Sequence, residues 1–262
     1  MRLDGPVAFR AGGYAPRRIA WASAVTLVGL LAIWQAFAWL GWMSTSFASS
    51  PVLIGQALVQ LTASGELWSH LSASLRRLAI GWAIGTVAGL LVGVALGLYT
   101  LARSPGMAVV SALFPVPKIA LVPLFIIWFG IGEGSKLVTL AFGVFFPTVI
   151  NTVAGVDAVP RGLIRMAQSF GLRPWSVVRK VVLPGALPAI LSGFRITTST
   201  AIVLLVAAEM IGADRGIGAF VLQAGNLYDT DNLLAGIVVL SAIGLSGAWV
   251  IGLIERNLLR WR

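Results

Sequence analysis

Cysteine is absent from this chain of 262 residues, and histidine occurs once, at His70. The absence of cysteine excludes a disulfide framework and any thiolate metal site, and it leaves the redox compartment undetermined. A single histidine excludes an imidazole-rich metal centre. We therefore predict that the chain binds no metal.

Charged side chains are also scarce. They make up 11% of the residues, whereas 58% are hydrophobic, and the mean hydropathy is +0.93. A soluble domain carries roughly 25% charged residues. The composition therefore indicates an integral membrane protein.

Motifs for catalysis and for ATP binding are missing as well. Intramembrane serine proteolysis needs a histidine near a buried serine, and we expect His70 to lie in a loop. An aspartyl dyad is excluded because every aspartate falls at a span end or in a loop. Neither GxxxxGKS nor GxxxxGKT occurs, so the chain binds no ATP through a P-loop. We predict that it is not an enzyme, holds no cofactor, and depends on an energised partner that docks from outside the membrane.

Six segments are apolar and close to the length of a membrane span, which is about 20 residues. The first is too long for a cleavable signal, and no small-residue cleavage pattern follows it. We expect a basic tail at 1–18, a core domain at 65–255 with five of the spans, and a second tail at 256–262. The predicted spans are residues 19–42, 78–102, 105–130, 137–156, 196–212 and 232–254.

Lysine and arginine are distributed unevenly between the two sets of span ends, and they favour the cytoplasmic side of a membrane. The side with fourteen cations carries both tails and a polar loop at 157–194, so we predict that these are cytoplasmic. The net charge of +10 is then explained by topology, and we expect no nucleic-acid partner. The fourteen are Arg2, Arg10, Arg17, Arg18, Arg103, Arg161, Arg165, Arg173, Arg179, Lys180, Arg195, Arg256, Arg260 and Arg262.

Four cations fall on the opposite side: Arg76, Arg77, Lys136 and Arg215. The first two lie at the outer end of the second span. One interpretation is that they belong to an amphipathic segment, Leu67–Leu78, lying in the membrane interface.

Glycine recurs at every fourth position in the second span. Small residues at this spacing let another helix approach closely. Helix packing within one subunit is the favoured interpretation, and a subunit interface or gate is the alternative. The residues are Gly81, Gly85, Gly89, Gly93 and Gly97.

The third span contains Pro115, Pro117 and Pro123, so its helix must be kinked or broken. Irregular backbone at membrane depth is tolerated where it lines protein or a water-filled cavity, which makes this segment a candidate for the translocation pathway. Lys118 and Glu209 are charged near the middle of spans. Lys118 could attract an anionic substrate or reach to the interface. Glu209 could line a gate or accept hydrogen bonds from backbone and hydroxyl groups.

The loop at 157–194 predicts a docking element. Pro160 suits the first turn of a helix and Gly171 suits a left-handed stop. Between them Leu163, Ala167 and Phe170 share one helical face, with Ile164 beside them, while Arg161 and Arg165 lie away from it. A turn at Arg173-Pro174 and a second short helix, ended by Leu183-Pro184, complete the element.

This loop resembles the EAA loop of ATP-binding-cassette importer permeases, written EAA-x3-G-x9-I-x-L-P. Ala167, Gly171, Val181, Leu183 and Pro184 stand at matching positions, whereas Arg165 replaces the glutamate and Met166 the first alanine. Further runs resemble the nitrate, sulfonate and taurine branch of that family, and the resemblance covers about residues 65–255. These runs are Pro115-Val-Pro117, residues 123–133, residues 146–156, Ala208-Glu-Met210 and Gly216-Ile-Gly218.

The resemblance implies an all-α, MetI-like permease with six spans in the bacterial inner membrane. Such a subunit imports a small anionic solute (nitrate, a sulfonate, taurine or a related organic acid) with a solute-binding protein and membrane lipid around it. ATP and Mg would be bound by a cytosolic ATPase dimer, and a second permease subunit, expected to be an identical copy, would complete the complex. The coupling residues are Arg161, Leu163, Ile164, Arg165, Ala167, Phe170, Gly171, Leu183 and Pro184.

Two alternatives stay open from the residues themselves. A channel or scaffold subunit working without an ATPase would not need a folded cytoplasmic element with defined stops. A secondary transporter is disfavoured because the sequence shows no internal repeat and few coupling carboxylates.

Overall fold

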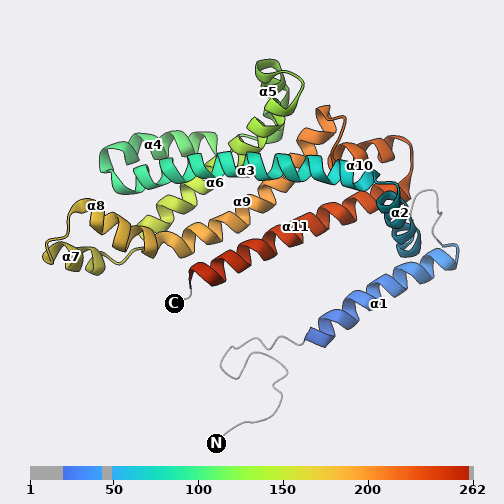
Figure 1. Cartoon of the computed structure of the whole chain (residues 1–262), viewed down its shortest axis with the longest axis horizontal. Helices are drawn as coiled ribbons and strands as arrows, with labels where there is room; N and C mark the ends of the chain where they lie inside the picture. The colour runs from blue at the N-terminus through green and yellow to red at the C-terminus, as the bar shows by residue number, and fades with distance from the viewer. Residues whose placement is uncertain (1–19, 43–48, 260–262) are drawn as a thin grey trace, which may run out of the picture.

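The computed structural model describes residues 20–42 and 49–259, and within these ranges it is helical and contains no strand (Figure 1). The tail at 1–18 and the last three residues lie outside the described residues. The helices are α1 (Ala20–Trp39), α2 (Pro51–Ala63), α3 (Glu66–Leu98), α4 (Thr100–Leu113), η1 (Lys118–Leu121), α5 (Val122–Phe129), α6 (Glu133–Asp157), α7 (Arg161–Ser169), α8 (Pro174–Val177), η2 (Val178–Val182), α9 (Leu183–Gly212), α10 (Ile217–Asn226) and α11 (Thr230–Leu258).

Three long helices form the centre of the molecule, with α6 packed against α3 on one side and α9 on the other. Because α6 is covered on both sides, several of its apolar residues are completely buried: Leu140, Val144 and Val149 have no exposed surface. A helix that is apolar around most of its circumference is typical of such a central position.

The remaining helices surround this centre. α11 packs against α9, α10 and α2. α1 contacts α2, where the Trp34 indole donates a hydrogen bond to the Ser49 carbonyl at 3.0 Å. α7 and α8 lie at the left end of Figure 1, and α10 lies at the opposite end.

Four helices are long and apolar enough to cross a membrane: α3, α6, the continuous stretch Pro174–Gly212, and α11. The pair α4 and η1–α5 passes the same test together and is bent by 86°, so it is either a broken fifth span or a re-entrant loop. The break predicted from the three prolines is therefore confirmed. α1, of 20 residues, is the counterpart of the first predicted span, whose residue 19 lies outside the described residues.

Several helices begin earlier than the predicted spans, and the early starts of α3 and α6 carry charged residues. α3 begins at Glu66, so Leu67–Leu78 is the first part of a long helix and not a separate segment, and His70 lies in this helix and not in a loop. α6 begins at Glu133, before the predicted start at residue 137. A hydropathy profile does not assign the charged residues of these two starts to a span. In the folded protein their charges are paired or buried.

The prediction that Leu183-Pro184 ends a short helix is wrong. Helical structure continues from Pro174 to Gly212 through the π-turn η2. There the Leu183 N–H donates to the Val178 carbonyl, five residues back. Proline has no N–H to donate, and this wider turn lets the helix pass Pro184 without ending.

The glycine face of α3 lies against α6. A Cβ added at Gly89 would stand 2.7 Å from the Thr148 Cβ, and one at Gly93 would stand 2.6 Å from the Thr152 Cβ. No real Cβ tolerates such distances without movement of a neighbour. The close approach of α3 and α6 therefore requires glycine at these positions.

We predict that Gly89→Val lowers the thermal unfolding temperature of the purified protein in detergent, because overpacking costs about 1–3 kcal/mol. The matched control is Gly55→Val on α2, where an added Cβ meets no atom within 4 Å. Equal unfolding temperatures for the two variants would contradict this account of the α3–α6 contact.

Candidate functional site

The predicted docking element is present as a compact unit at one end of the molecule. α7 starts directly after Pro160, and Gly171 has φ of +70°, the left-handed conformation that glycine adopts most readily. The Leu172 N–H donates to the Ala167 carbonyl at 3.3 Å and closes the turn. The two local signals in the sequence therefore define this helix.

A small apolar core holds α7 against α8 and η2. Ala167 is buried beside Val177 and Val182, and Ile164 packs against the same cluster. The predicted apolar stripe is thus divided, because Leu163 and Phe170 point outward with 45% and 78% of their surface exposed. These two, with the exposed Met166, leave an apolar surface that nothing in the described chain covers.

The other residues assigned to coupling divide between surface and interior. Arg161 and Arg165 are exposed on α7, so they can reach a partner. Leu183 and Pro184 are partly buried in the first turn of α9, so they position the element and do not form its outer surface.

The broken span between α4 and α5 positions Lys118. Its ammonium donates to the Phe114 carbonyl and lies 4.8 Å from the centre of the Phe114 ring. Pro117 and Pro123 are exposed at the same break. Lys118 therefore donates to a carbonyl and lies over a ring of its own chain, within a segment whose backbone departs from a continuous helix.

Glu209 lies at the opposite end of the molecule from α7, with 1% of its surface exposed. It accepts hydrogen bonds from the Ser74 hydroxyl at 2.8 Å and the Gly218 N–H at 2.9 Å. The Arg77 guanidinium donates to it at 2.8 Å and so neutralises its charge. Of the two roles considered for Glu209, acceptance of backbone and hydroxyl donors is confirmed.

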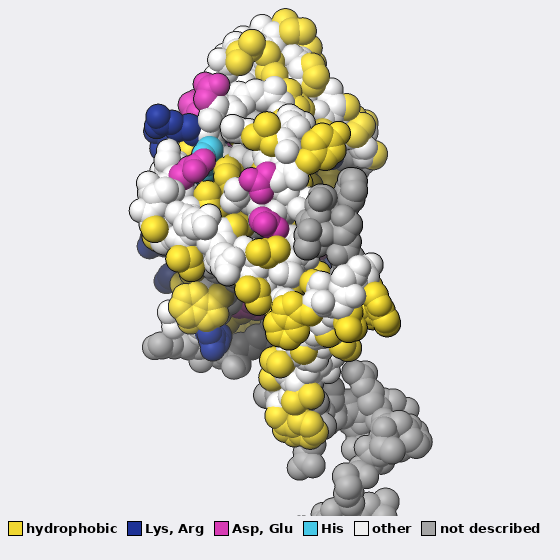
Figure 2. Space-filling model, turned by 90° about the vertical axis from the view of Figure 1, so that its right-hand side faces the viewer, with side chains coloured by type: hydrophobic (Ala, Val, Ile, Leu, Met, Phe, Trp, Pro, Cys, Tyr) yellow, Lys and Arg dark blue, Asp and Glu magenta, His cyan; other side chains and the backbone are white. Residues whose placement is uncertain are grey.

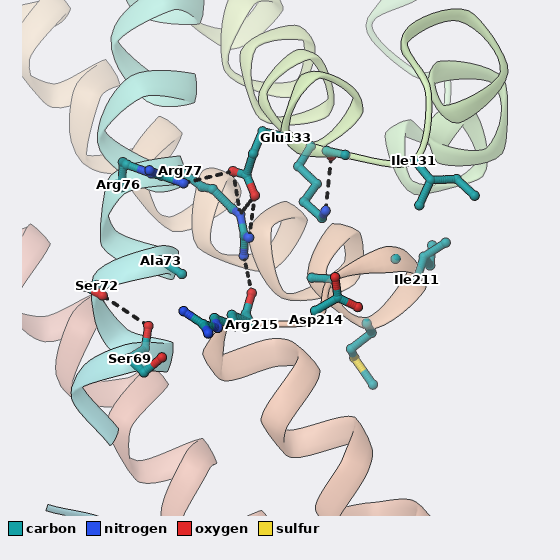
Figure 3. Close-up of a pocket in the computed structure, with 15 residues that line it drawn as sticks. Ser69, Ser72, Ala73, Arg76, Arg77, Ile131, Glu133, Ile211, Asp214 and Arg215 are labelled. Atoms are coloured by element: carbon teal, nitrogen blue, oxygen red, sulfur yellow. Dashed lines mark hydrogen bonds and ion pairs between the residues drawn. The ribbon is translucent and has the colours of Figure 1, made fainter. Parts of the chain in front are cut away.

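Arg77 also joins a second carboxylate. It donates to Glu133 through Nε and Nη2, the latter at 2.6 Å, and to the backbone carbonyl of Arg215 (Figure 3). Since Glu133 belongs to α6 and Glu209 to α9, one guanidinium connects three helices. Figure 2 looks onto this end of the molecule, where charged side chains and the one histidine gather among hydrophobic ones.

Sequence reasoning missed Ser74, Arg77 and Glu133 as partners of this network. One signal was present, because His70, Ser74 and Arg77 recur at helical spacing and therefore share one face of α3. His70 Nδ1 lies 3.1 Å from the Gly216 nitrogen, on the same side as the other two. The partners on α6 and α9 are far away in sequence and carry no local signal.

Comparison with known proteins identifies the family. The family described as "Binding-protein-dependent transport system inner membrane component" matches residues 85–260, which include the broken span, α7 and Glu209. The chain belongs to this family. This permease is accordingly an inner-membrane, transmembrane subunit of an ATP-driven importer and not its catalytic subunit.

Individual relatives agree with the family. The permease is 35% identical over 247 residues to the putative aliphatic sulfonates transport permease protein SsuC of Bacillus subtilis, covering 94% of this chain and 90% of the relative. It is 37% identical over 241 residues to the taurine transport system permease protein TauC of Escherichia coli, covering 90% and 88%.

Solved structures confirm the MetI-like fold. An inward-facing structure of the MetNI methionine ABC transporter superimposes with a TM-score of 0.61 at 26% identity, covering 73% of this permease and 94% of that chain. The orientation of the termini stays a prediction from the cation distribution.

We predict that Arg77→Met destabilises the permease by about 3–5 kcal/mol, because it leaves Glu209 buried without its counter-ion. Arg195→Met is the matched control: its ion pair with Glu255 is largely exposed, so the loss should stay below about 1 kcal/mol. Thermal unfolding in detergent measures both. Adding Glu209→Gln to Arg77→Met should recover part of the loss, and a double variant no more stable than Arg77→Met would contradict the pairing.

Proposed function

We propose that this permease forms the translocation pathway for a small organic solute that carries a sulfonate group. The observation that carries the proposal is similarity over 94% and 90% of this chain to permeases named for aliphatic sulfonates and for taurine. Taurine is itself an aliphatic sulfonate, so the two names share one chemistry. Nitrate and other organic acids are the remaining members of the predicted solute class.

The energy for import would come from a cytosolic ATPase dimer that binds ATP and Mg and seats α7 in a groove. Two features support this role for α7. Its inner face is held by Ile164 and Ala167, so the element keeps its shape without a partner. Its outer face presents Leu163, Met166 and Phe170, which are apolar and exposed at the end where a cytoplasmic partner would dock.

A second copy of the permease would complete the pathway, with lipid on the outer faces. The exposed apolar residues of α5, among them Ile127 and Trp128, stand beside the 86° break. Such a surface supports burial against a second subunit or lipid, because large exposed apolar patches are rare on free protein surfaces.

Uptake by a reconstituted complex tests the proposed solute. Proteoliposomes containing the permease, its ATPase and its binding protein should accumulate radiolabelled taurine or butanesulfonate when ATP is supplied on the ATPase side. Nitrate and a carboxylate of equal chain length serve as competitors. Uptake of a carboxylate or nitrate without any uptake of sulfonates would contradict the proposal.

A surface variant of α7 tests the coupling role. Phe170→Ser should weaken binding of the ATPase by about tenfold or more, since buried aromatic anchors dominate interfaces. The stability of the permease itself should not change, because this side chain is 78% exposed. Trp249→Ser on α11, which is 63% exposed, is the control. Co-purification of the ATPase with each variant is the measurement, and retention of ATPase by Phe170→Ser at wild-type level would exclude α7 as the docking surface.

A further inference from the structure

A pocket of about 770 Å³ opens beside the Arg77 network, at the end of the permease opposite α7 (Figure 3). It lies between α3, the start of α6, and the segment that joins α9 to α10. Its charged lining residues are Arg76, Arg77, Lys136, Arg215, Glu133 and Asp214.

The pocket has an excess of positive charge. Four cations stand against two carboxylates, which gives a formal charge of +2. Glu209, buried behind Arg77, lowers the total for the whole cluster to +1. Glu133 already pairs with Arg77 at 2.6 Å and lies 3.8 Å from Arg76. The remaining positive charge therefore resides on Lys136 and Arg215.

Lys136 is the residue that most needs a ligand. It is 6% exposed, and its ammonium donates one hydrogen bond, to the Gly132 carbonyl at 3.1 Å. Across the described part of the chain no carboxylate lies within 4 Å of it, and Glu133, Asp214 and Glu209 act on it only at longer range. An ammonium has three donors, and burial of a cation without a counter-ion in direct contact is costly. A bound anion would supply the missing acceptors and a negative charge in direct contact.

The wall of the pocket also contains apolar side chains. Ile131, Met210 and Ile211 line it together with the charged residues. In Figure 3 the labelled Ile131 and Ile211 lie on one side of the pocket, and Arg76, Arg77 and Arg215 lie on the other. The pocket thus offers cations to one part of a ligand and apolar side chains to another.

We propose that this pocket binds the transported solute on the outer side of the permease, as a small oxoanion with a short aliphatic chain. Lys136 holds the anionic group as a point charge, and Arg215 adds donors from the pocket rim. Ile131 and Ile211 contact the chain. This inference rests on the proposed function, since docking of α7 on a cytosolic ATPase directs the pocket away from the cytoplasm.

Direct binding to the purified permease–ATPase complex, without binding protein, is the first test. Radiolabelled butanesulfonate is the probe, and inorganic sulfate, which lacks an apolar chain, is the competitor. Lys136→Gln should weaken butanesulfonate binding about tenfold or more, while Lys136→Arg keeps most of it. Arg215→Gln should also weaken butanesulfonate binding. Because Arg215 is exposed, this substitution does not endanger folding. Arg256→Gln on α11 removes an equal charge elsewhere and should change nothing.

Unchanged butanesulfonate binding by Lys136→Gln and Arg215→Gln would overturn the proposal, and so would absence of binding to the wild-type complex. Sulfate competing as well as unlabelled butanesulfonate would overturn the role of the apolar wall. These outcomes are separate from the proposed function, which fails if the wild-type complex with its binding protein imports no sulfonate.

A competing occupant is an acidic side chain of the docked binding protein, and ATPase stimulation separates the two. If the solute occupies the pocket, Arg215→Gln should lower the transport rate severalfold when the solute-loaded binding protein is saturating. The concentration of binding protein that gives half-maximal ATPase stimulation should stay the same. A shift in that concentration with an unchanged maximal rate would assign the pocket to the binding protein and overturn the proposal.

Discussion

The end of this permease opposite α7 depends on how the charge of Glu209 is neutralised. A carboxylate with 1% of its surface exposed is stable only if cationic and hydrogen-bonding partners surround it. α3 supplies Ser74 and Arg77, and α10 supplies the N–H of Gly218. The backbone must come very close for this last bond: a Cβ added at Gly218 would stand 3.0 Å from the Glu209 Cβ. The Gly216-Ile-Gly218 motif and Glu209, separate in the sequence, are thus two parts of one contact.

The sequence predicts those parts of the fold whose causes are local. Pro160 and Gly171 act within one turn of α7, so its limits are close to the predicted ones. Pro115 and Pro117 lie between α4 and η1, Pro123 lies in the first turn of α5, and the helix breaks at the place they occupy. Span starts depend instead on distant residues. Arg77 lies within α3 because Glu209, more than a hundred residues away, neutralises it, and a hydropathy reading contains no information about that partner.

The helix end predicted at Leu183-Pro184 was wrong for a different reason. Proline ends a helix only where the backbone cannot accommodate the loss of the hydrogen bond that another residue's N–H would donate there. Here the π-turn η2 accommodates this loss, and residues 174–212 form one helical stretch. The apolar side chains of Val177 and Val182, packed against Ala167, favour this continuation because it brings them onto the same core. The same core explains why the apolar stripe of α7 is divided between an inner and an outer face.

This continuous stretch connects the two ends of the permease. It begins beside α7 at Pro174 and carries Glu209 one turn before its end. Arg77 contacts Glu209 on α9 and Glu133 on α6, so a movement that separates these two helices at this end must break one ion pair. Because Ser74 and Arg77 both lie on α3, Glu209 keeps Ser74, Arg77 and Gly218 if α3 stays with α9, and the pair that breaks is the more exposed one between Arg77 and Glu133. Separation of α6 therefore leaves the buried Glu209 neutralised, which makes it less costly than any movement that pulls Glu209 away from α3 and α10.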